Sequence, residues 1–79
     1  MAVIAVDELQ PRAQAALVSS PFYELRELHV EWRDEALQLS GCVSSYYHKQ
    51  LAQEVVRSVC GNTLVINSIC VEHEEEDVP

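Results

Sequence analysis

The apolar residues of this chain change their spacing along its length, and each change predicts an element of secondary structure. Residues 7–20 carry apolar side chains at helical spacing and predict a first helix. Asp7 with Gln10 three residues later resembles a capping box, which places Pro11 in the first turn, where its missing N–H costs little. Pro21 ends this helix, because the residue before a proline is pushed out of the α region.

A β-hairpin is predicted next, because the apolar positions now alternate. Residues 28–33 and 37–43 each alternate between apolar and other side chains, and residues 34–35 between them form a tight turn without the usual glycine. The core-facing positions are Leu28, Val30, Trp32, Leu37, Leu39, Gly41 and Val43.

A second helix over residues 46–59 follows, with Ser44 or Ser45 as its N-cap and Gly61 beyond its end. Its apolar stripe is predicted to centre on Val55. The stripe consists of Tyr47, Leu51, Val55 and Val59, widened by Ala52 and Val56.

Residues 63–71 are β-branched and apolar and predict a full last strand. The order is then α-β-β-α-β, and the crossover should be right-handed and set the last strand parallel to the second. Because one face of the hairpin is polar, both helices are expected to pack on the other, apolar face of the sheet. The predicted fold class is α+β: a small mixed three-stranded sheet with two helices packed on one face.

Length and charge limit what the chain does. Its 79 residues make one domain, and the net charge of −8 argues against nucleic acid as a partner, because a polyanion needs clustered Lys and Arg. We divide the chain into an apolar extension (1–6), a folded domain (7–71) and an acidic tail (72–79) that holds five of the thirteen acids. The tail is interpreted as disordered and solvated, with an arm for a basic partner as the alternative.

The three cysteines have no spacing typical of a metal site or a redox motif. Cys42, Cys60 and Cys70 predict free thiols in a reducing cytoplasm, with Cys60 and Cys70 as small apolar fillers. No secretory signal or membrane span is recognised at residues 1–6 or elsewhere. We therefore expect no catalytic residues, no metal site and no cofactor.

The second half of the chain resembles the BON domain family. The resemblance rests on LQLSGCVSS at residues 37–45, LAQEVV at 51–56, Gly61 and VINSICV at 65–71, and it extends over residues 9–71. Asn62 and the turn at 34–36 depart from the family pattern. The resemblance implies a non-enzymatic module that binds phospholipid membranes, while some cytoplasmic members bind small ions or serve as accessory modules.

Two residues of this motif have structural interpretations. Gly41 would let its strand lie close to the crossing helix, where a side chain would hold the two apart. Asn67, on the core-facing side of the last strand, would satisfy a backbone group near a helix end.

The start of the second helix is the candidate ligand site. If Tyr47 points to the core, Tyr46 faces solvent beside His48 and Lys49. Helix N-termini attract phosphate, so Tyr46, His48 and Lys49 would bind a lipid headgroup at a membrane surface. Capping plus a surface aromatic is the alternative interpretation, and the acidic charge of the chain counts against anionic lipid.

The last strand supplies a candidate interface. Leu64, Ile66 and Cys70 share the sheet face that no predicted helix covers. These residues would bind another protein or form a homodimer. The alternative is that residues 2–6 fold back and cover this face. A small-ion site built from backbone carbonyls is a third option.

Overall fold

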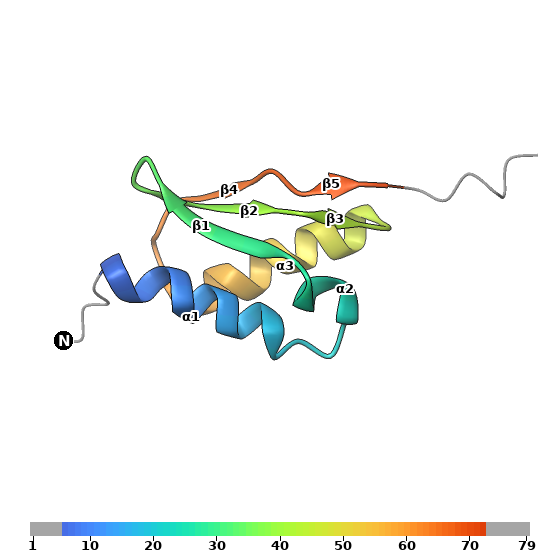
Figure 1. Ribbon diagram of the computed structural model, residues 1–79, viewed down its shortest axis with the longest axis horizontal. Coiled ribbons are helices and arrows are strands. Elements are labelled where there is room, and N and C mark those ends of the chain that lie inside the picture. The colour runs from blue at the N-terminus through green and yellow to red at the C-terminus, as the bar shows by residue number, and fades with distance from the viewer. Residues whose placement is uncertain (1–5, 73–79) are drawn as a thin grey trace, which may run out of the picture.

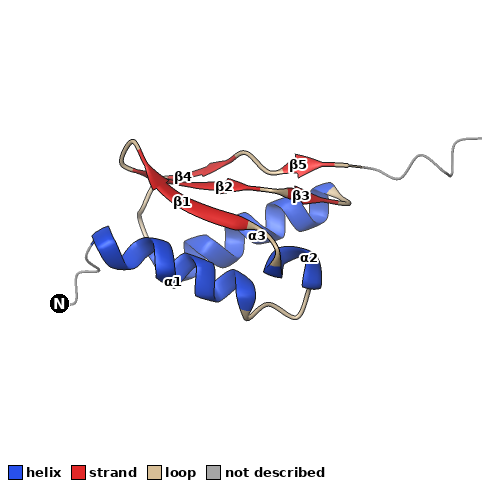
Figure 2. Ribbon diagram, viewed as in Figure 1, coloured by secondary structure: helices blue, strands red, loops and turns tan. Residues whose placement is uncertain are grey.

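A computed structural model describes residues 6–72, which form a layer of strands over a layer of helices (Figures 1 and 2). The elements in chain order are α1 (Val6–Val18), α2 (Tyr23–Arg26), β1 (His29–Arg33), β2 (Ala36–Ser40), β3 (Cys42–Val43), α3 (Tyr46–Cys60), β4 (Val65–Asn67) and β5 (Cys70–Val71). The helices lie on one side of the sheet (Figure 1). The predicted α+β class and the shared helical face are confirmed, and the short α2 is an addition to them.

The sheet has the predicted mixed pairing. β1 pairs with β2 antiparallel, and β2 pairs with β4 parallel, in the order β1-β2-β4. A second parallel pair is formed by β3, which follows β2 along the chain, and β5, which follows β4 (Figure 1). The hairpin turn lies at Asp34 and Glu35, as predicted, with φ of 54° and 63°.

The predicted second and last strands are each interrupted, so the prediction of two continuous strands is wrong in detail. Gly41 has φ of 120°, a backbone conformation that takes it out of the β ladder. The last strand, which pairs with this segment, is interrupted at residues 68–69. Residues 36–43 and 65–71 nevertheless stay hydrogen-bonded across the interruption, because Ser68 N–H donates to Leu39 O at 3.0 Å and Cys70 N–H donates to Gly41 O at 2.8 Å.

Gly41 is tightly packed, but its neighbour is not the helix that the sequence suggested. A Cβ built on Gly41 would lie 2.8 Å from Cδ2 of Leu28, the buried residue just before β1. The glycine therefore makes room for the hairpin's own first strand to begin.

The buried face of α3 is shifted from the predicted one. Ala52, Val56 and Cys60 are buried, whereas Val55 is only half-buried. The reason is that α3 packs against α1 as well as the sheet, with Cys60 Sγ lying 3.9 Å from Leu9 O. Tyr47, predicted to face the core, is 62% exposed.

Two glutamines of α1 cover the free edge of β1. Gln10 Oε1 accepts from Trp32 N–H at 2.8 Å, and Gln14 Oε1 accepts from Val30 N–H at 3.0 Å. Gln14 Nε2 also donates to Leu28 O at 2.8 Å. The predicted capping box is therefore wrong: Asp7 lies inside the helix, and the Gln10 side chain is used on the sheet. Pro11 likewise lies inside α1 and not in its first turn.

Residues 1–5 and 73–79 lie outside the described part of the chain. The prediction that residues 2–6 cover the sheet face falls on those segments except for Val6, which begins α1, and the prediction of a disordered acidic tail falls on them except for Glu72. At the last described residue, Glu72 N–H donates to Val43 O at 2.8 Å and extends the β3–β5 pairing by one bond.

Candidate functional site

The N-terminus of α3 is capped by its own sequence. Ser45 is the N-cap residue, with φ of −153° and ψ of 157°, and its Oγ accepts from His48 N–H at 3.2 Å. The same Oγ lies 2.8 Å from Nδ1 of His48, so the imidazole is held against the cap. The sequence left Ser44 and Ser45 as alternatives, and the structure selects Ser45.

A cluster of aromatic rings surrounds this helix start, and we call it the aromatic cluster. Its members are Phe22, Tyr23, Tyr46, Tyr47 and His48. Phe22 and Tyr47 meet edge to face at 6.4 Å between ring centroids, and the His48 ring lies 5.6 Å from Phe22 and 5.5 Å from Tyr47. Tyr23 and Tyr46 are 68% and 70% exposed. The cluster therefore presents large ring surfaces to solvent.

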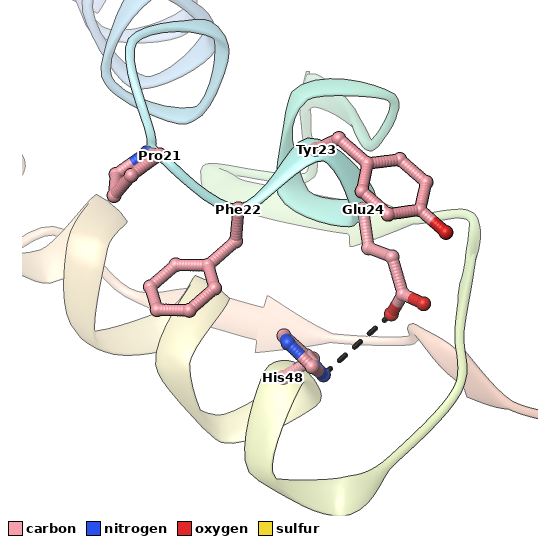
Figure 3. A pocket seen from close by; sticks show the side chains of 5 residues that line it. All are labelled: Pro21, Phe22, Tyr23, Glu24 and His48. Atoms are coloured by element: carbon pink, nitrogen blue, oxygen red, sulfur yellow. Dashed lines mark ion pairs between the residues drawn. The ribbon is translucent and has the colours of Figure 1, made fainter.

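Glu24 places a carboxylate at the same helix start. Its Oε1 accepts from Ser44 N–H at 3.0 Å and lies 3.6 Å from Nδ1 of His48 (Figure 3). The hydrogen bonds from Ser44, and to a lesser degree the nearby His48, lower the pKa of Glu24 below its usual value. Glu24 is therefore ionised at neutral pH. A free phosphate at this helix start would meet a carboxylate that is already in place.

A shallow hollow of about 190 Å³ opens between α2 and the start of α3. It is lined by Pro21, Phe22, Tyr23, Glu24 and His48 (Figure 3). The Phe22 ring and the Glu24 carboxylate both point toward His48 in this view. An aromatic wall with one carboxylate suits a small cationic group.

Of the three headgroup residues predicted from the sequence, only His48 lines the hollow. Tyr46 and Lys49 are neighbours at the same helix start, with Lys49 Nζ 5.9 Å from the centroid of the Tyr46 ring. Sequence reasoning missed residues 21–24, because they follow the first helix and were treated as its connection. The available signal was the pair of aromatic residues directly after Pro21.

The predicted interface residues lie apart from this hollow: Ile66 is in β4, Cys70 is in β5, and Leu64 directly precedes β4 and borders Gln53 and Arg57 of α3. Leu64 is 62% exposed, Ile66 is 39% exposed and Cys70 is also exposed. Among the described strands, β4 is an edge of its sheet, with a neighbour on one side only. Cys60 is buried as predicted, but the exposure of Cys70 shows that it is not an apolar filler of the core.

Within residues 6–72, the structure contains no helix that is both long and apolar enough to cross a membrane. A family model for the BON domain matches residues 5–73 of the chain. No curated protein matches it.

Proposed function

This chain belongs to the BON domain family, and on that premise we propose that it is a non-enzymatic module that binds the phospholipid surface of a membrane. The observation that carries the proposal is the exposed aromatic cluster at the start of α3. Tyrosine rings have an apolar body and a polar tip, and such side chains are enriched at the level of lipid headgroups.

Charge favours zwitterionic lipid over anionic lipid. The chain carries a net charge of −8, and Glu24 adds a carboxylate at the site itself. An anionic membrane repels both. We propose that the ammonium group of a zwitterionic headgroup enters the hollow, where Glu24 and the Phe22 and Tyr23 rings would attract a cation.

Lys49 and Tyr46 supply the complementary part of the proposed site. The headgroup phosphate would lie beside Lys49 Nζ, which projects over the Tyr46 ring. The backbone N–H groups of Ser44 and His48 already donate to Glu24 and Ser45, so these two groups are not free for a phosphate, and we propose Lys49 as its main partner. This differs from the prediction from sequence, in which the helix end was the main attraction.

Co-sedimentation with phosphatidylcholine vesicles and with phosphatidylglycerol vesicles tests the proposal. We expect binding to the zwitterionic vesicles and weaker binding to the anionic ones. Tyr46→Ala with Tyr47→Ala should lower vesicle binding at least tenfold, because it removes most of the exposed ring surface. Leu64→Ala is the matched control, since Leu64 is as exposed as Tyr47, at 62%, but lies outside the aromatic cluster and does not line the hollow.

Lys49→Glu should also weaken binding while leaving the fold intact, and added salt should weaken what Lys49 contributes. The absence of binding to either vesicle at every salt concentration would contradict the lipid function. Binding that survives loss of both tyrosines but not of Leu64 would place the membrane contact on the sheet.

Self-association through the open sheet face is a second candidate. The exposed apolar groups of Leu64 and Ile66 adjoin the unpaired edge of β4, and such edges pair readily with another copy. A twofold dimer would bury this patch and add stability to a small core.

Sedimentation velocity at several concentrations tests this candidate. Ile66→Lys should convert a dimer to a monomer, because it places a charge in the contact. Gln50→Lys, at an exposed position of α3, is the control for an added charge. A wild-type chain that stays monomeric at high micromolar concentration rules the candidate out.

A further inference from the structure

The pairing of β3 with β5 brings two thiols and a carboxylate together on the open sheet face. Cys42 and Cys70 are direct partners in the parallel register. Glu72 follows Cys70 by two residues, and side chains two apart in extended chain share a face. The two sulfur atoms and a carboxylate oxygen all lie within 4.8 Å of one another, and all three residues are exposed.

We propose that Cys42, Cys70 and Glu72 form a binding site for a thiophilic divalent cation of the Zn²⁺ type. Zn²⁺ takes tetrahedral sets of thiolate, imidazole and carboxylate ligands. Three protein ligands leave the fourth position to water. Nothing in the spacing of the cysteines along the chain points to this site, because its two thiols come from different strands.

The dimensions suit such an ion. With Zn–S bonds of about 2.3 Å and a tetrahedral angle, two thiolates on one ion lie about 3.8 Å apart. The three ligand atoms are within 4.8 Å of one another before any ion binds, so side-chain rotation alone brings them into range.

Main-chain hydrogen bonds hold the backbone of this site in register. Cys70 N–H donates to Gly41 O at 2.8 Å, on one side of Cys42, and Glu72 N–H donates to Val43 O at 2.8 Å, on the other. The ligands therefore project from a paired ladder and not from a mobile loop. A site on a rigid element loses little entropy when it binds an ion.

The donor set suits a soft cation. Cys42 and Cys70 supply two sulfur atoms and Glu72 one carboxylate oxygen, all on exposed residues. Thiolate ligands select ions such as Zn²⁺, whereas Mg²⁺ and Ca²⁺ take oxygen ligands.

Cd²⁺ titration of the reduced chain tests the proposal, because Cd²⁺ substitutes for Zn²⁺ and Cd–thiolate bonds absorb in the ultraviolet. We expect a charge-transfer band that saturates at one ion per chain. Zn²⁺ should compete with Cd²⁺ and abolish the band.

Substitutions separate this site from other thiols. Cys42→Ser and Cys70→Ser should each weaken Cd²⁺ binding at least tenfold, and Glu72→Gln should weaken it while the band remains. Cys60→Ala is the matched control: Cys60 is buried beside Leu9 and should leave the titration unchanged. Zn²⁺ should also raise the thermal midpoint of the wild type but not of Cys42→Ser.

Three results would overturn the proposal. The first is a titration without a saturable band. The second is a band that persists when Cys42 and Cys70 are both replaced by serine. The third is a stoichiometry of one ion for two chains, which would show that the ion bridges molecules and is not held within one sheet.

Discussion

The side-chain amide of Asn67 lies 3.0 Å from the main-chain oxygen of Lys49 and joins the last strand to the first turns of α3. Nδ2 of the same amide lies 3.1 Å from Gln53 Oε1, and Oδ1 accepts from Ile69 N–H at 3.1 Å. One side chain thus connects helix α3 to the sheet at the interruption between β4 and β5. The expectation that Asn67 satisfies a helix backbone group is confirmed.

Replacing Asn67 should destabilise the domain. Asn67→Ala removes three hydrogen bonds and leaves half-buried partners unpaired, and we expect a loss of about 1–3 kcal/mol in the free energy of unfolding. Asn67→Asp keeps the acceptor for Ile69 N–H but sets a charge against two oxygens, so it should cost at least as much. Urea denaturation measures both. An Asp variant as stable as the wild type would show that the Nδ2 bonds contribute nothing.

The buried stripe of α3 gives a paired test. Val56 is 0% exposed, so Val56→Asp buries an unpaired charge and should abolish the folded state. Val55→Asp lies beside it at a half-buried position and should leave a folded but weaker domain. Val56→Ala should cost about 1.5–3 kcal/mol. Thermal unfolding followed by circular dichroism ranks the variants, and a more severe effect at Val55 than at Val56 would contradict the observed packing.

Glu24 should make the stability of the domain depend on pH in the acid range. Its pKa is lowered in the folded state, chiefly by hydrogen bonds from Ser44, so its contribution to stability is present above the ordinary pKa of 4.5 and is lost as pH falls through the lower folded value. Glu24→Gln should therefore be less stable than the wild type at pH 7, and the difference should disappear in strong acid. Unfolding by urea across this pH range measures it.

His48→Gln separates the causes of that shift. His48 is a minor contributor to the lowered pKa of Glu24, so most of the acid dependence should remain in this variant. If the dependence disappeared with His48, the ion pair and not the Ser44 hydrogen bond would be its source.

A glycine in the hairpin turn should raise the stability of the domain. Asp34 and Glu35 both have positive φ, and Glu35, at 63°, occupies the position where two-residue turns favour glycine. Glu35→Gly should raise stability by up to about 1 kcal/mol, because left-handed backbone strain exceeds the extra chain entropy of glycine. Glu27→Gly, at the C-cap of α2 with φ of −99°, is the control and should bring no gain. Equal effects of the two changes would argue against strain at Glu35.

The sequence by itself determined the two long helices, the hairpin and the order in which they follow, but not the short α2 or the interruptions of the strands. Alternation of apolar residues located the hairpin, and the helical period located α3. Ser44 or Ser45 and Gly61 marked the two ends of α3, because these signals act between residues only a few positions apart. The pairing of the last strand followed from the connection rules, and the family followed from the motif at residues 37–71.

Only the tertiary structure decided what depends on distant contacts. The packing of α1 against α3 moved the buried stripe toward Val56, and the fold brought Glu24 to His48 and paired Cys42 with Cys70. The local spacing of apolar residues does not predict these contacts, because each partner lies on an element whose position depends on the packing of the whole core. For that reason the sequence predicted the helix start as a candidate site but neither the carboxylate of Glu24 beside His48 nor the pairing of Cys42 with Cys70.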